Sequence, residues 1–227
     1  LEGLPRPVGG PGGAPGQGRK VRVVLVGEDA GRAAHQGPVS RPRLVPRIGV
    51  ARGGVALQGP PGGVAEAARV VRASGLRVTG FQVLRDFEGL SGHLHHYKVD
   101  IAKAMLEMCA ALDCKVLLAC SSTSAHATQD LDHIARDLRK LAMLALPLGI
   151  KIAYEGLSWG RTINEFTTAW DVVCRADCPN LGLGLDSYHV FAAKTPLDAI
   201  EDLDPNKIFL VQLADFMWQE TKSFEER

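Results

Sequence analysis

Three apolar runs of the sequence each end in a side chain that carries oxygen, namely Glu155, Asp186 and Gln212. Helical patterns separate these runs, so we expect parallel strands whose C-terminal ends meet at the mouth of a barrel. Two carboxylates and one amide oxygen suit a hard cation such as Mg²⁺ or Mn²⁺ and do not attract thiophilic ions. We therefore expect the three side chains to share one divalent cation, which predicts a metal-dependent enzyme. A solvated loop position is the alternative for either carboxylate taken alone.

His189 is the candidate for proton transfer. It stands three residues after Asp186, just past the expected strand end, where its ring can reach the same pocket. The ordinary pKa of histidine lies near working pH, which suits a general acid or base. A nearby cation would polarise a ketone oxygen and stabilise the enolate formed when a neighbouring C–H bond is deprotonated, a step common to isomerisation and dehydration. A surface position in the loop is the alternative for this histidine.

Arg85, Trp159 and Arg161 are candidates for binding a substrate. Arg85 follows an apolar strand and offers a planar fork for a carboxylate, and a salt bridge to Asp86 or Glu88 is the alternative. Arg161 is a weaker candidate of the same kind. Trp159 either forms a wall of the pocket or fills the core.

The elements that must position these residues follow one another regularly. Apolar runs predict five strands, and patterns of apolar residues spaced by three or four predict the intervening helices. Consecutive strands separated by helices imply an α/β fold with a parallel sheet and right-handed crossovers. Periodicity alone leaves open whether the sheet closes into a barrel. The expected strands are 76–84, 114–120, 150–155, 181–186 and 207–213, and the expected helices are 64–74, 95–112, 131–148, 163–176 and 196–202.

The composition changes sharply near residue 63, which divides the chain into a segment 1–63 and a partial barrel 64–227. The first segment holds 16 of the 25 glycines and nine of the 13 prolines, which makes it a poor folding unit. Strands are conceivable at 21–26 and 48–57. A disordered basic leader and a coding segment read in the wrong frame are the two explanations, and we favour the second because a barrel needs two further βα units here.

Length, charge and cysteine content exclude several classes of protein. A chain of 227 residues is near the lower end for a complete (β/α)8 barrel of typically about 250 residues. The net charge of +1 gives no reason to expect a nucleic-acid or membrane partner. The five cysteines match no zinc motif, so buried free thiols in a reducing cytosol are expected. No apolar run spans a bilayer and no signal peptide is visible, which predicts a cytoplasmic protein.

Four blocks of the sequence resemble a known family. They read Phe-Gln-Val-Leu-Arg-Asp-Phe-Glu-Gly at 81–89, Tyr-Glu-Gly-Leu-Ser-Trp-Gly-Arg at 154–161, Leu-Asp-Ser-Tyr-His at 185–189 and Phe-Leu-Val-Gln-Leu-Ala-Asp at 209–215. Together they resemble the sugar phosphate isomerase/epimerase superfamily with its xylose-isomerase-like TIM barrel. Within it the chain is most similar to bacterial 3-dehydroshikimate dehydratases, including those fused to a hydroxyphenylpyruvate-dioxygenase-like domain. The resemblance covers about 64–220.

The resemblance implies which residues bind the metal and which ligand is missing from this chain. It makes Glu155, Asp186 and Gln212 three of four family metal ligands, and the fourth, a glutamate on the last strand, would lie beyond Arg227. It also favours a catalytic role for His189. The chain is therefore expected to be a truncated barrel with about five recognisable βα units.

The resemblance also implies an activity. We expect a metal-dependent lyase that converts 3-dehydroshikimate to protocatechuate and water, as in aromatic catabolism, on a small-molecule substrate. The full-length protein would then carry a C-terminal dioxygenase-like domain. A sugar phosphate isomerase or epimerase acting on a ketose is one alternative, and an inactive fragment or interaction module is another.

Overall fold

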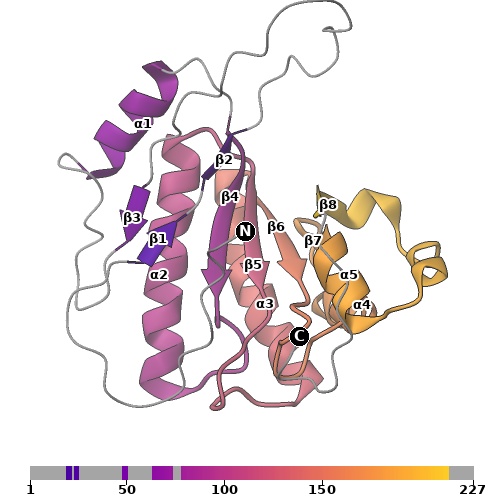
Figure 1. Ribbon diagram of the computed structural model, residues 1–227. Coiled ribbons are helices and arrows are strands. Elements are labelled where there is room, and N and C mark those ends of the chain that lie inside the picture. The colour runs from indigo at the N-terminus through magenta and orange to yellow at the C-terminus, as the bar shows by residue number, and fades with distance from the viewer. Residues whose placement is uncertain (1–18, 22, 26–47, 51–62, 74–77, 215–227) are drawn as a thin grey trace, which may run out of the picture.

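Five parallel strands form the centre of the fold. The structure is a computed structural model that describes residues 19–21, 23–25, 48–50, 63–73 and 78–214 (Figure 1). Neighbouring strands are consecutive in the sequence, so each helical crossover returns the chain to the next position of one sheet. The strands are β4 (Val78–Arg85), β5 (Val116–Cys120), β6 (Lys151–Glu155), β7 (Leu181–Asp186) and β8 (Ile208–Gln212).

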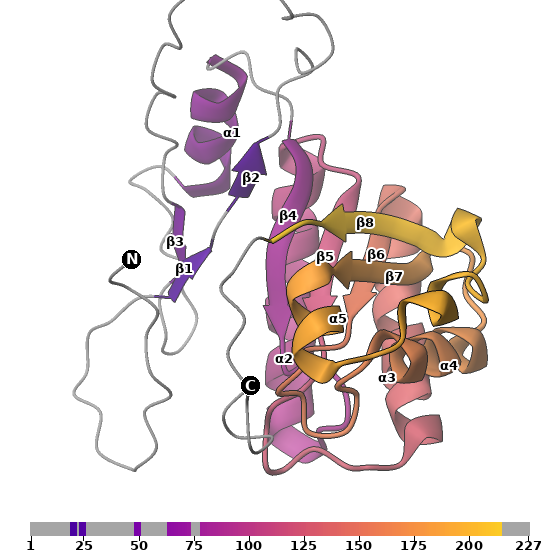
Figure 2. The same cartoon turned by 45° about the vertical axis from the view of Figure 1, so that its right-hand side comes forward.

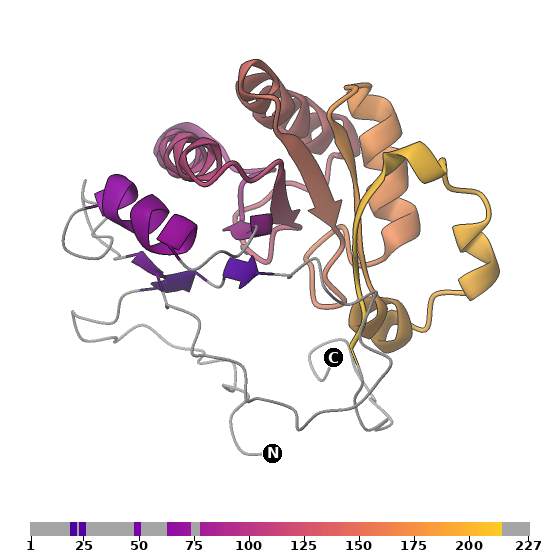
Figure 3. The same cartoon turned by 90° about the horizontal axis from the view of Figure 1, so that it is seen from above.

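The sheet twists and curves into half of a barrel, and Figure 2 shows its strands fanning out from β4 to β8. Seen from above, the helices that alternate with the strands lie along its outer side (Figure 3). The predicted α/β barrel fold and the order of its elements are therefore confirmed. The α-helices are α1 (Gly63–Ala73), α2 (Gly92–Ala111), α3 (Leu131–Ala145), α4 (Phe166–Ala176) and α5 (Ser187–Ala193). Short 3-10 turns are η2 (Leu146–Leu148), η3 (Leu197–Ile200) and η4 (Pro205–Lys207). None of the described helices is long and apolar enough to cross a membrane.

Side chains alternate between the two faces of the sheet, and this alternation decides which residues can meet at the site. Leu117 and Ile152 belong to the main core between the sheet and the helices. Leu118 and Ala153 belong to a smaller cluster on the opposite face. A Cβ at Gly184 would meet Leu118 Cδ1 at 2.9 Å, so a glycine lets β7 come close to its neighbours on this second face. We call this second face the inner face.

Helix α3 shows how the sequence sets an element boundary. The Asp130 side chain accepts the backbone N–H groups of Asp132 and His133, which caps the helix start. The predicted apolar stripe to Leu148 is wrong at its end, because α3 ends at Ala145, η2 follows with Pro147 in it, and Leu148 is exposed. Proline has no N–H group to continue the helical hydrogen bonds.

The N-terminal segment contributes three short strands. The strand β2 (Val23–Leu25) pairs antiparallel with β4, so β4 has a neighbour that the sequence did not predict. The strands β1 (Arg19–Val21) and β3 (Ile48–Val50) form a separate antiparallel pair. Apart from these strands and Gly63, the predicted segment 1–63 lies outside the described residues. Most of the expected strand 48–57 therefore lies outside them too.

Candidate metal centre at the strand ends

The ends of β6 and β7 bring three ionisable side chains together. One donor atom each from Glu155, Asp186 and His189 lies within 4.8 Å of the other two. The capping of α5 explains this proximity, because Asp186 Oδ1 accepts the Tyr188 backbone N–H at 2.8 Å and so starts the helix directly at the strand end. His189 consequently lies in the first turn of α5, beside the carboxylate that caps it.

Gln212 lies on the strand next to this cluster. It is the register partner of Asp186, and register partners in parallel strands present their side chains to the same face. The Ser187 Oγ atom accepts the Ala214 backbone N–H at 2.8 Å, which fixes the end of β8 against the start of α5. Of the predicted ligand set, Glu155 and Asp186 thus lie together, and Gln212 lies beside Asp186. The structure adds His189 to the group.

Glu155 has an environment suited to a cation. Its side chain is buried, its Oε2 atom is 2.9 Å from the Cys120 thiol, and its Oε1 atom is buried without a described partner. Burial raises the pKa of Glu155 to about 7. A buried carboxylate with an unpaired oxygen is costly alone, whereas a bound cation would compensate both its charge and its lost hydration. The donor set of carboxylate and amide oxygens therefore fits a hard divalent cation.

Cys120 is the residue of this centre that sequence reasoning missed. It was expected only to be a buried thiol, and it is indeed buried. The available signal was its position, since Cys120 ends β5 just as Glu155 ends β6, and the two residues are register partners.

His189 is buried and held at one ring nitrogen. Its Nδ1 atom accepts the Ser158 backbone N–H at 3.2 Å, and Ser158 Oγ lies 3.3 Å from the same atom. An accepting Nδ1 assigns the proton of the neutral ring to Nε2. Burial lowers the pKa of His189 to about 4, a shift that the Asp186 charge opposes and the Arg85 charge reinforces. The neutral ring can therefore present an N–H group at Nε2, and in this tautomer Nε2 cannot bind a cation.

The rings of Trp159 and Tyr188 pack against His189. The Trp159 ring lies edge-on to His189 at a centroid distance of 4.8 Å and edge-on to Tyr188 at 6.0 Å. Trp159 also contacts the apolar cluster of the inner face and is only partly buried. Trp159 thus packs against both the cluster of the inner face and His189, and its role as a pocket wall stays a prediction.

Arg85 ends β4, is exposed, and acts electrostatically on the cluster. Its positive charge opposes the rise in the pKa of Glu155 and adds to the lowering of the pKa of His189. The salt bridges considered for Arg85 are replaced by other contacts, because Asp86 accepts the Thr123 backbone N–H at 2.8 Å and lies 3.8 Å from Lys98. The role of Arg85 in binding a substrate stays a prediction.

Arg161 is bound to the loop after β5. Its Nε atom donates to the Ala127 carbonyl oxygen at 3.2 Å, and its backbone N–H donates to the Ser122 carbonyl oxygen at 2.8 Å. These contacts connect the loop after β6 with the loop after β5. The contacts described for Arg161 are therefore structural ones.

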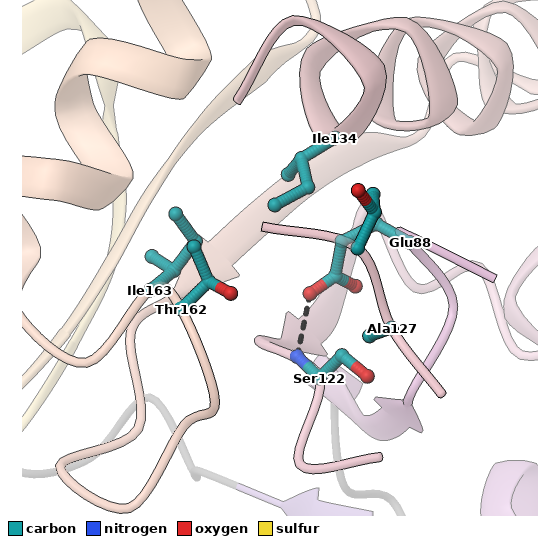
Figure 4. Close-up of a pocket in the computed structure, with 7 residues that line it drawn as sticks. Glu88, Ser122, Ala127, Ile134, Thr162 and Ile163 are labelled. Atoms are coloured by element: carbon teal, nitrogen blue, oxygen red, sulfur yellow. Dashed lines mark hydrogen bonds between the residues drawn. The ribbon is translucent and has the colours of Figure 1, made fainter. Parts of the chain in front are cut away.

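Glu88 lies in a small pocket that shares no lining residue with the Glu155 cluster (Figure 4). Its Oε1 atom accepts hydrogen bonds from the Ser122 backbone N–H and the Tyr154 hydroxyl. One buried carboxyl thus connects the segment after β4 with both the segment after β5 and β6 itself. Burial raises the pKa of Glu88 to about 7. The sequence suggested only a salt-bridge role for this residue.

The chain belongs to the xylose isomerase-like TIM barrel family, whose model matches residues 52–226. The family assignment agrees with the half-barrel and with the position of the cluster at the strand ends, where barrel enzymes carry their active sites.

Its relatives include dehydratases and isomerases. The 3-dehydroshikimate dehydratase of Pseudomonas aeruginosa is 40% identical over 141 residues, which are 62% of this chain and 22% of that protein. The inosose isomerase of Bacillus licheniformis is 30% identical over 125 residues, which are 53% of this chain and 45% of that protein. The matched region therefore spans about a fifth of the dehydratase.

Two solved structures share the fold. A xylose isomerase-like TIM barrel/4-hydroxyphenylpyruvate dioxygenase fusion protein superposes with a TM-score of 0.64 at 35% identity, over 68% of this chain and 25% of that chain. The IolI protein with a bound zinc atom superposes with a TM-score of 0.60 at 24% identity, over 69% of this chain and 59% of that chain.

Proposed function

We propose that the chain is part of a metal-dependent 3-dehydroshikimate dehydratase, a lyase that forms protocatechuate and one molecule of water from 3-dehydroshikimate. The observation that carries this proposal is the cluster of Glu155, Asp186 and His189 at the strand ends of a chain that is 40% identical to such a dehydratase. The reaction removes a proton and a hydroxyl group from the substrate ring, so it needs a proton carrier and stabilisation of negative charge.

Glu155, Asp186 and Gln212 would hold the cation, with Mg²⁺ or Mn²⁺ favoured by the oxygen donors. The unpaired Oε1 atom of buried Glu155 supports this assignment. A bound cation supplies positive charge against the carbonyl oxygen of the substrate as negative charge develops there.

His189 would present its Nε2–H group to the substrate, because Ser158 holds Nδ1, and would donate a hydrogen bond to the oxygen on which negative charge develops. Its low pKa keeps the ring neutral at working pH. Arg85 would bind the substrate carboxylate through its planar guanidinium group. Trp159 would form a wall that excludes water beside His189, and Arg161 would support this wall through the neighbouring loop.

A sugar isomerase or epimerase is the second candidate, and the 30% identity to an inosose isomerase favours it. The same residues would then serve a reaction that moves hydrogen between adjacent carbons of a ketose without loss of water. The likeness to the fusion protein further supports a dioxygenase-like domain in the full-length protein. We also place the protein in the cytoplasm, because its cysteines carry free thiols.

The decisive experiment offers 3-dehydroshikimate and a ketose phosphate in turn to the purified protein, with Mn²⁺ and after chelation. We expect protocatechuate to form only with the metal present, and an Asp186→Ala variant to lose it. The matched control is Asp198→Ala, at an exposed carboxylate in η3. Conversion of the ketose alone would establish the isomerase, and dehydration that survives chelation would contradict the metal site.

A further inference from the structure

The Cys120 thiol lies directly against Glu155. Its Sγ atom is 2.9 Å from Glu155 Oε2, and the two side chains are 2% and 4% exposed. The contact follows from the sheet, because the two residues are register partners at the ends of β5 and β6. Neighbouring strands therefore hold the thiol and the carboxylate side by side on the inner face.

Two other buried thiols contact backbone carbonyl oxygens instead of a carboxylate. Cys114 Sγ lies 3.2 Å from the Val116 carbonyl oxygen, and Cys178 Sγ lies 3.5 Å from the Ala176 carbonyl oxygen. Neither contact involves a charged side chain. The Cys120 contact differs because its acceptor is a carboxylate of the candidate metal centre.

The contact gives the two carboxylate oxygens of Glu155 different environments. Oε2 receives the thiol hydrogen, whereas Oε1 is buried without a described partner. A carboxylate held at one oxygen cannot rotate freely, and its second oxygen keeps one direction. We infer that Cys120 is a positioning residue that orients Glu155 so that Oε1 is the atom offered to the cation. This inference rests on the proposed metal site.

A thiol is chemically suited to this position. It is a weak donor, so it orients the carboxylate without neutralising it as a lysine or arginine would. It also behaves as a small apolar group, which fits the surrounding cluster of Leu118, Ala153 and Leu157. Hydrogen-bonding partners of metal ligands typically contribute about 10-fold to 100-fold in metal affinity.

The test is Mn²⁺ affinity, measured by electron spin resonance on the purified chain. Cys120→Ala and Cys120→Val both remove the donor, and valine keeps the volume in case the alanine variant does not fold. We expect Mn²⁺ affinity to fall by about 10-fold or more in both variants. Cys120→Ser keeps a donor and should retain most of the affinity. Cys178→Ala, at a buried thiol without a carboxylate contact, should bind as the wild type does.

The outcomes separate this inference from the function on which it rests. Wild-type affinity in a folded donor-free variant would overturn the role of Cys120 and leave the metal site standing. A serine variant as weak as the donor-free variants would also overturn it, because the donor would then not matter. No Mn²⁺ binding by the wild type would overturn both the metal site and the positioning role.

Discussion

Ser158 and His189 are joined by a hydrogen bond in which the Ser158 backbone N–H donates to His189 Nδ1 at 3.2 Å. The bond connects the loop after β6 to the first turn of α5, so it links two strand ends of the candidate centre. Because the donor is a backbone group, it holds the ring whatever side chain occupies position 158. The neutral ring thereby presents its N–H group at Nε2.

Replacement of His189 by glutamine should lower turnover by about 10²-fold or more, the usual scale for loss of a preorganised hydrogen-bond donor that stabilises negative charge in the transition state. Mn²⁺ affinity should change little, because Nε2 carries the ring proton and is not offered as a ligand. Steady-state kinetics with 3-dehydroshikimate and metal titration measure the two effects. Ser158→Ala is the matched control, since it removes Oγ but keeps the backbone donor. A wild-type rate for His189→Gln would refute the role.

Asp186→Asn should weaken Mn²⁺ binding while the protein stays folded. Asparagine keeps an oxygen that can cap α5, so the variant removes charge without removing the cap. The affinity should fall by more than about 10-fold, since losing a ligating carboxylate costs at least as much as losing its hydrogen-bonding partner. Calorimetric titration measures the affinity, and circular dichroism checks the fold. Equal affinities for the variant and the wild type would contradict the assignment.

Arg85→Lys should raise KM more than it lowers kcat. Lysine keeps the charge but loses the planar fork that binds a carboxylate through two hydrogen bonds. A contact made equally in the ground and transition states affects KM and leaves kcat unchanged. Arg69→Lys, on the exposed surface of α1, is the control. If kcat falls and KM does not change, Arg85 has a role in the chemical step.

The sequence was sufficient to predict the five parallel strands with the helices between them, and where the ionisable residues lie on these strands. Apolar runs separated by helices imply a parallel sheet, and a parallel sheet places Glu155 and Asp186 at one edge. Both Cys120 and Glu155 end predicted strands, but their direct contact also depends on the register between the two strands, which the sequence does not give. The antiparallel position of β2 beside β4 escaped prediction for a related reason, since short glycine-rich segments carry weak pairing signals.

Contacts made by loop residues could not be predicted from the sequence either. Ser158 and His189 are 31 residues apart, and the residues next to them in the sequence do not indicate that the two are in contact. Glu88 illustrates the same limit, because its partners Ser122 and Tyr154 come from two later segments. Such contacts follow from how loops fold over the strand ends, which periodicity does not encode.

Glu88 should make the stability of the protein depend on pH. Burial raises its pKa from the ordinary 4.5 to about 7, and the nearby Asp86 charge adds to this increase. The folded state therefore binds the Glu88 proton more tightly than the unfolded state does. Its contribution is fully present below the unfolded pKa and is lost as pH rises through about 7. The loss is at most about 3.5 kcal/mol, because the rise from 4.5 to about 7 is about 2.5 units at about 1.4 kcal/mol per pKa unit.

Glu88→Gln should remove this contribution without disturbing the fold. Glutamine stays neutral and keeps an oxygen for the Ser122 amide and the Tyr154 hydroxyl. Relative to this variant, the metal-free wild type should lose free energy of unfolding between about pH 5 and pH 8. Glu155, whose pKa is also raised to about 7, should preserve part of the pH dependence in both proteins. Urea unfolding across this range measures the difference, with Glu107→Gln on the exposed side of α2 as the control. Parallel stability curves for the wild type and Glu88→Gln would show that Glu88 has no such raised pKa.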